Sequence, residues 1–185
     1  MKYLLWMLPL FILACANPSK EEGETELWEF HPQNHQSTWD QQAFLIVNEY
    51  QVIQQNLNVN DTNSYKMAIQ NLMAITDTIV AHTVETDSLT QNIWLTGLQN
   101  YRNELEALVL EQDPMQVQQQ FNMCTVSLIH FLGDIGYSKT NLYIFQKVEG
   151  EDGWFWIGTS KSSKNPFDKT DRKDYNASFT LQDPS

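Results

Sequence analysis

Apolar residues recur at steps of three and four through the middle of this chain, and this periodicity restricts its fold more than any other feature. The clearest run alternates steps of four and three and comprises Trp94, Leu98, Tyr101, Leu105 and Leu108. Residues spaced in this way lie on one side of an α-helix and form the seam through which helices pack in a bundle. The sequence therefore predicts a helix here with one buried face.

Four segments of this kind follow one another with short connections between them. The first two cover about 39–57 and 62–81, a cap at 86–88 starts the third, and Pro114 stands at the first position of the fourth. Helices joined by short loops pack as antiparallel neighbours. We therefore expect a mainly α fold, an antiparallel four-helix bundle, within a single domain that spans residues 39–185.

The C-terminal part of the chain has the composition of strands. Residues 142–145 and 154–157 are all aromatic or aliphatic (Leu142, Ile144 and Ile157 are the aliphatic ones), and they flank a turn between Gly150 and Gly153. A further strand is predicted at 177–181. The bundle is thus expected to carry a small C-terminal β-hairpin or three-stranded sheet.

Neighbouring residues of a strand point to opposite sides, so Trp154 and Trp156 are expected on one face of the hairpin. One face is expected to close the helical core and the other to meet a partner or ligand. The residues of this predicted surface are Tyr143, Phe145, Trp154, Trp156, Asn165 and Phe167. The alternative is that Trp156 is a core aromatic and that residues 165–167 only form a turn.

The first 14 residues have the features of a secretory signal. Lys2 precedes an apolar run from Tyr3 to Leu13, which is shorter than the roughly 20 residues that a membrane-spanning helix needs. The tetrapeptide Ile12-Leu13-Ala14-Cys15 resembles a bacterial lipobox. This resemblance implies that Cys15 becomes the mature N-terminus and carries acyl chains such as palmitate, which anchor the protein in a lipid bilayer. A chance cysteine in an ordinary signal peptide is the alternative.

Residues 15–38 are predicted to form the acylated cysteine and a flexible tether, because their composition is polar and shows no sustained period. We expect a lipid-anchored protein of the cell envelope, most simply at the outer membrane. Within the tether, Lys20-Glu21-Glu22 resembles the short signals that send some lipoproteins to the cell surface. Periplasmic and surface-exposed orientations both remain open.

Composition and motifs also exclude several functions. A formal net charge of −12 argues against nucleic acid as a partner, because phosphate binding requires a basic stripe. The chain has no G-x-S-x-G, H-E-x-x-H or C-x-x-C motif, and no phosphate-binding loop. Cys124, the only cysteine besides Cys15, is expected to be a small buried hydrophobe. We therefore expect neither an enzyme nor a bound cofactor.

A metal site is the weaker hypothesis for the fourth helix. Its candidate ligands are Met123 and His130, with Met115 nearby, and methionine at helical spacing more often fills a core. His31 and His35 in the tether have a spacing that suits a metal only on a helix, which Pro32 disfavours.

One short motif in the C-terminal part is recognisable. Trp156-Ile157-Gly158, six residues and then Asn165-Pro166-Phe167 resemble the domain-of-unknown-function 3347 family of periplasmic helical domains. Members occur as stand-alone lipoproteins or fused to adaptor subunits of heavy-metal efflux systems. Many carry Cys-Pro-Met before the tryptophan, where this chain has Gln146-Lys147-Val148, and a further Met and Cys-Gly after the turn, where this chain has neither. The resemblance thus implies the fold but not the copper ligands.

Two functions follow as hypotheses. The first is a membrane-anchored, non-catalytic binding or accessory module whose aromatic surface engages another envelope protein or a small ligand. The alternative is a periplasmic copper-handling protein associated with an efflux system. An exposed apolar patch built from Trp154 and Trp156 would favour the first, and converging His and Met side chains would favour the second.

Overall fold

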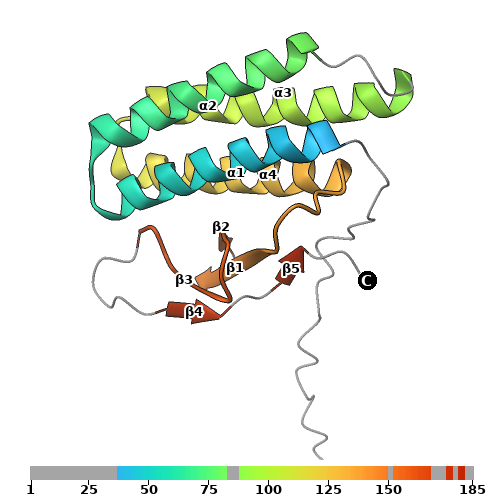
Figure 1. Cartoon of the computed structure of the whole chain (residues 1–185). Coiled ribbons are helices and arrows are strands. Elements are labelled where there is room, and N and C mark those ends of the chain that lie inside the picture. The colour runs from blue at the N-terminus through green and yellow to red at the C-terminus, as the bar shows by residue number, and fades with distance from the viewer. Residues whose placement is uncertain (1–36, 83–87, 150–151, 168–173, 177–178, 182–185) are drawn as a thin grey trace, which may run out of the picture.

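The computed structural model describes residues 37–82, 88–149, 152–167, 174–176 and 179–181. Four helices account for most of these residues: α1 (Ser37–Asn58), α2 (Thr62–His82), α3 (Ser88–Leu110) and α4 (Pro114–Asp134). They pack side by side, each antiparallel to the next (Figure 1). The predicted antiparallel four-helix bundle is confirmed.

The helix starts follow the expected capping chemistry. The carboxylate of Asp113 accepts hydrogen bonds from the N–H groups of Met115 and Gln116, at 3.0 and 3.1 Å, and Pro114 occupies the first turn of α4. Asp61 accepts a hydrogen bond from the N–H of Ser64 in the same way at the start of α2. The reversal between α1 and α2 passes through Asn60, whose φ of 61° is one that asparagine tolerates.

The predicted seam residues form the core. All five residues of the α3 run are at most 2% exposed, and α4 buries a matching set that includes Val117, Phe121, Cys124, Leu128 and Phe131. At the end of the bundle where α1 begins, Trp39 packs edge-on against Trp94, with 5.0 Å between ring centroids. Apolar periodicity thus located the buried face of each helix correctly.

Five strands follow the helices: β1 (Leu142–Glu149), β2 (Asp152–Gly158), β3 (Ser162–Lys164), β4 (Asp174–Asn176) and β5 (Phe179–Leu181). The order β2-β1-β5 makes a three-stranded antiparallel sheet, which confirms the predicted hairpin and last strand. β3 and β4 pair in a second, two-stranded sheet that the sequence did not predict. The strands lie beside α1 and α4, away from α2 and α3 (Figure 1).

The larger sheet is joined to the bundle through the open edge of β2. Asn122 of α4 accepts a hydrogen bond from the N–H of Phe155 at 2.8 Å and donates one to the carbonyl of Gly153 at 3.3 Å. Gln51 of α1 donates to the carbonyl of Ile157 at 2.7 Å. Side chains of two helices thus satisfy backbone groups that an edge strand would otherwise expose.

No helix among the described residues is long and apolar enough to cross a bilayer. Cys15, the predicted signal peptide 1–14 and nearly all of the predicted tether 15–38 lie outside the described residues.

Candidate functional site

The hairpin does not present the aromatic surface that the sequence predicted. Tyr143, Phe145, Trp156 and Asn165 are all buried, and only Trp154 and Phe167 are half-exposed. Phe145 and Trp156 are cross-strand partners whose rings stack at 5.4 Å and 13°. Their large apolar area is removed from solvent by this pairing, so these two rings belong to the core.

The segment 165–167 acts as a turn former. The side-chain oxygen of Asn165 accepts a hydrogen bond from the N–H of Phe167 at 2.9 Å, and Asn58 donates to the backbone carbonyl of Asn165 at 3.2 Å. The Phe167 ring then packs edge-on against Phe121 of α4. These contacts attach the turn to the bundle through both α1 and α4.

Phe167 also borders a hollow of about 220 Å³ at the end of the bundle, between the α1–α2 and α3–α4 turns. Its walls include Leu57 and Val117, and Lys66 and Glu111 stand at it as charged groups. Burial and the nearby Glu111 carboxylate together raise the pKa of Tyr65, which also lines this hollow.

Cys124 is buried, as predicted, and burial raises the pKa of its thiol well above the ordinary value. A thiol in this environment is held in its neutral form, which is a poor nucleophile and a poor metal ligand. Cys124 therefore contributes packing to the bundle core.

Met123 and His130 occupy the outer face of α4. Met123 is 49% exposed and His130 is also exposed. They are seven residues apart, which places them on the same side of the helix. Gln146 and Lys147 are half-buried on β1.

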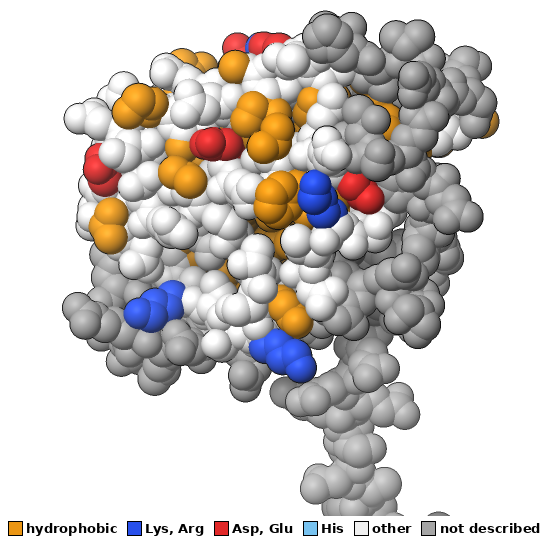
Figure 2. All heavy atoms as spheres, viewed as in Figure 1, with side chains coloured by type: hydrophobic (Ala, Val, Ile, Leu, Met, Phe, Trp, Pro, Cys, Tyr) orange, Lys and Arg blue, Asp and Glu red, His pale blue; other side chains and the backbone are white. Residues whose placement is uncertain are grey.

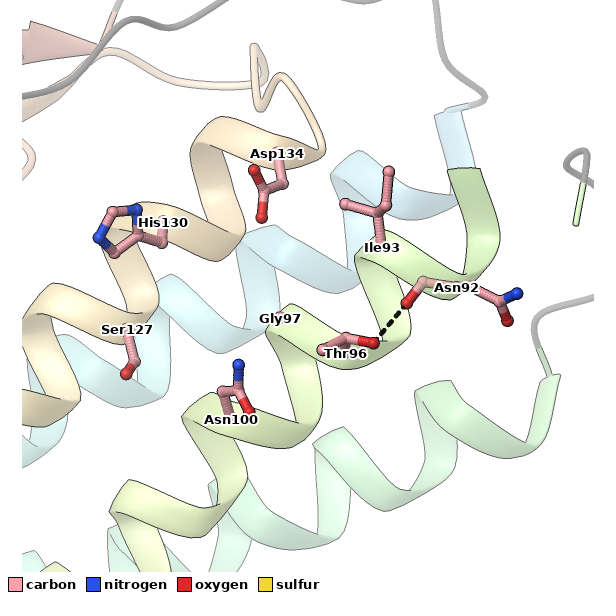
Figure 3. Close-up of a pocket in the computed structure, with 8 residues that line it drawn as sticks. All are labelled: Asn92, Ile93, Thr96, Gly97, Asn100, Ser127, His130 and Asp134. Carbon is pink, nitrogen blue, oxygen red and sulfur yellow. Dashed lines mark hydrogen bonds between the residues drawn. The ribbon is translucent and has the colours of Figure 1, made fainter. Parts of the chain in front are cut away.

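His130 stands at the rim of an open groove between α3 and α4, with a volume of about 480 Å³ (Figure 3). Six of the residues that line this groove are polar: Asn92, Thr96 and Asn100 from α3, and Ser127, His130 and Asp134 from α4. Within each helix they are spaced by three or four residues, so each set lies on one helix face. We call this feature the α3–α4 groove.

One polar group of the groove already makes a hydrogen bond within its own helix, and two others point into the groove. The hydroxyl of Thr96 donates to the carbonyl of Asn92 at 2.7 Å, within its own helix. The amide of Asn100 and the carboxylate of Asp134 turn toward the space between the helices (Figure 3). The groove therefore offers a ligand both donors and acceptors.

Gly97 forms the floor of the groove. A Cβ atom at this position would lie 3.5 Å from the carboxylate of Asp134 and 3.6 Å from the ring of Phe131, which are ordinary contact distances. Alanine would fit here, and glycine within a helix costs about 0.5–1 kcal/mol relative to alanine. The glycine is thus not required for packing, and its effect is to deepen the groove.

The charge at the groove comes from Asp134. Partial burial raises the pKa of its carboxyl group, and the neighbouring His130 partly offsets this shift. The backbone carbonyl of the same residue accepts a hydrogen bond from the indole of Trp94 at 2.9 Å, which attaches the end of α4 to α3. The position of Asp134 is therefore fixed by the core.

The sequence identified only His130 of these lining residues. The signal that points to the others is Gly97, a poor helix former in the middle of the most regular helix, with Asn100 three residues later. Pairing this face with residues 127, 130 and 134 of α4 required the structure, because periodicity does not tell which polar faces meet.

Neither the placement of possible metal ligands nor comparison with known proteins assigns a function to these residues. The residues that the structure describes contain no group of three His, Cys, Asp or Glu side chains placed to hold a metal ion. Comparison of the chain with known protein families, with curated proteins and with solved structures gives no match.

Proposed function

We propose that this chain is a lipid-anchored, non-catalytic binding module of the bacterial cell envelope and that its α3–α4 groove receives a polar ligand. The observation that carries the proposal is the groove itself, in which six polar side chains from two helices surround an open hollow above Gly97. Ligand sites are typically concave and orient their ligand through a few convergent polar groups.

The chemistry of the groove restricts its ligand. Asp134 supplies an acceptor, Asn100 supplies a donor and an acceptor, and Ser127 supplies a hydroxyl group. The carboxylate of Asp134 favours neutral or cationic ligands over anions. The half-exposed Ile93 adds one apolar contact.

The membrane part of the proposal rests on the sequence. Ile12-Leu13-Ala14-Cys15 resembles a lipobox and follows a short apolar segment. Acylation of Cys15 would hold the domain at a bilayer through the tether, most simply at the outer membrane, where another envelope protein or a small molecule would be its partner.

A titration followed by two-dimensional NMR tests the groove. The ¹⁵N-labelled mature chain is titrated with a neutral disaccharide, cellobiose, and with a cationic dipeptide, Lys-Ala. We expect saturable shifts at residues 92–100 and 127–134 with at least one probe, and loss of these shifts in an Asn100→Ala, Asp134→Ala double variant. Gln99→Ala is the matched control, because Gln99 is exposed on α3 but does not line the groove. Shifts confined to other surfaces, or shifts that persist in the double variant, would contradict the assignment.

Copper handling is the alternative, and the observation that favours it is the shared outer face of Met123 and His130 on α4. Titration of the mature chain with Cu(I) against a competing chelator separates the two proposals. The binding module predicts no stoichiometric site that survives deletion of residues 16–38. A site that survives and is lost in His130→Ala or Met123→Ala would move the function to metal handling.

A further inference from the structure

The side of α1 that faces away from the core carries a second regular stripe. Its members are joined by steps of four and three and are all exposed: Gln41, Leu45, Asn48, Val52, Gln55 and Val59. The aliphatic members recur every seven residues, with exposed fractions of 51% for Leu45, 39% for Val52 and 68% for Val59. The N–H of Val59 bonds to the carbonyl of Gln55, so the helical spacing continues to the last member. We call this set the α1 stripe.

The α1 stripe contains no charged residue, although the chain as a whole has a net charge of −12. Figure 2 shows the corresponding face, on which separate hydrophobic side chains lie over α1 and α2 with a few charged side chains among them. The outer side of a surface helix is usually charged or polar. The α1 stripe departs from this pattern, because aliphatic residues stand at every seventh position with only uncharged amides between them, so a partner could cover it without desolvating a charge.

We propose that α1 pairs in parallel with α1 of a second copy of this chain, through the α1 stripe, when both copies are held at one membrane. In a parallel pair each seam residue meets its own counterpart, so Leu45, Val52 and Val59 form apolar layers. Asn48 and Gln55 form amide layers between them. A β-branched residue such as Val52 in the first seam position favours two-stranded pairing.

The parallel direction rests on the proposed lipid anchor. The anchored residue Cys15 precedes α1 in every copy, so a parallel pair places the two chain starts on the same side and keeps both anchors within reach of one leaflet. A two-fold axis normal to the membrane then relates them, as closed dimers require.

Charges beside the α1 stripe are complementary in this arrangement. The ammonium group of Lys139 lies over the ring of Phe44, 5.1 Å from its centroid, and Phe44 directly precedes Leu45. In a parallel pair, the residue that directly precedes Leu45 faces the residue five positions further along the partner helix. Phe44 of one copy therefore faces Glu49 of the other. Within the described part of its own chain Glu49 takes part in none of the ion pairs. Lys139 of one copy would therefore meet Glu49 of the other.

The size of the seam sets the conditions under which pairing occurs. A single helix pair buries less than the roughly 1,200–2,000 Å² of stable complexes, and two acidic copies repel each other. Pairing is thus expected to be weak in dilute solution. Confinement to one membrane raises the effective concentration to about the millimolar range, where weak contacts are populated.

Disulfide cross-linking of the full acylated chain in bacterial membranes tests the proposal. Acylation blocks Cys15 and Cys124 is buried, so an introduced surface cysteine is the one reactive thiol. Leu45→Cys faces itself only in the parallel pair and, on treatment with diamide, is expected to give at least about fivefold more covalent dimer than Met67→Cys. Met67, on α2, is 58% exposed and serves as the matched control for random collision. Adding Val52→Glu to Leu45→Cys, which sets two carboxylates opposite each other, is expected to reduce the yield to the control level.

Equal dimer yields from Leu45→Cys and Met67→Cys would overturn the proposal. It would also be overturned if Leu45→Cys cross-linked only to a Gln55→Cys chain, because those positions meet in an antiparallel pair. Fractionation of the same cells tests the anchor separately. If the chain is found in the soluble fraction, the lipid anchor is wrong. The dimer yields of Leu45→Cys and Met67→Cys, compared at about 1 mM soluble chain, then decide whether the α1 stripe pairs.

Discussion

The backbone N–H of Ile157 donates a hydrogen bond to the phenol oxygen of Tyr50, at 3.3 Å, and so connects the edge of β2 to the centre of α1. The Tyr50 hydroxyl in turn lies 2.8 Å from the hydroxyl of Thr125, which donates to the carbonyl of Phe121. Tyr50 therefore donates to Thr125, and one buried chain of hydrogen bonds runs from the sheet through α1 to α4. Burial raises the pKa of Tyr50, which keeps the donor proton in place.

Tyr50→Phe should destabilise the protein by about 1–3 kcal/mol, because it leaves the buried N–H of Ile157 without its acceptor. Urea unfolding followed by circular dichroism measures the change in the free energy of unfolding. An unchanged midpoint would mean that the sheet is not attached through this hydrogen bond.

Tyr101→Phe is the matched control for this prediction. Tyr101 is also fully buried, but its hydroxyl has no hydrogen-bond partner among the described residues. Removing an unpaired buried hydroxyl should leave the free energy of unfolding unchanged or raise it by about 1 kcal/mol. A loss as large as that of Tyr50→Phe would show that Tyr101 has a partner.

The bundle could be predicted from sequence because its signal is local. The run from Trp94 to Leu108 alternates steps of four and three, and Asp113-Pro114 marks a helix start through the capping carboxylate and the proline. The sheet contact could not be predicted in this way. It depends on which side chains of α1 and α4 reach the edge of β2, over separations of more than 30 residues, and aromatic composition does not distinguish a core pair such as Phe145 and Trp156 from an exposed surface.

Gly97→Ala should stabilise the protein by about 0.5–1 kcal/mol, because a Cβ fits at ordinary contact distances and glycine is a poor helix residue. It should also weaken binding in the α3–α4 groove, which it makes shallower. Urea unfolding and the NMR titration measure the two effects.

Gly158→Ala makes the same chemical change but should destabilise the protein. Its Cβ would lie 2.8 Å from the ring of Phe145 and 3.2 Å from the Cβ of Ser163. Overpacking of this kind costs about 1–3 kcal/mol. If Gly97→Ala were as destabilising as Gly158→Ala, the groove floor would be tighter than described.

Asp134→Asn should raise stability at neutral pH, because partial burial raises the pKa of the Asp134 carboxyl group in the folded protein. A raised carboxyl pKa means that the folded state binds the proton more tightly than the unfolded state. The contribution of Asp134 to stability therefore improves as the pH falls through its folded pKa toward the ordinary value of 3.8. The advantage of the variant should shrink over that window, as measured by thermal unfolding across pH.

The stability difference between Asp61→Ala and the parent should depend on pH in the opposite direction. Hydrogen bonds from Ser64 lower the pKa of Asp61, so the stability it contributes is present above the ordinary value and is lost as the pH falls through the folded pKa. The variant should be less stable than the parent at neutral pH and approach it in acid. Parallel pH profiles for the two variants would contradict these assignments.

The groove could be predicted only in part, since His130 was identified but its neighbours were not. Asn92, Thr96 and Asn100 read in sequence as a solvated helix face. They form one wall of the α3–α4 groove only because this face of α3 packs beside α4, with Gly97 between them.

Cys15 is proposed to hold this domain at a membrane, and membrane fractionation of Cys15→Ser is the direct test of that anchor. Cells that express the parent chain or the variant are labelled with a palmitate analogue and separated into soluble and membrane fractions. We expect a labelled, membrane-bound parent, and a variant that is unlabelled and either soluble or left as the uncleaved precursor. A mature, correctly cleaved Cys15→Ser chain that stays in the membrane fraction would contradict this expectation.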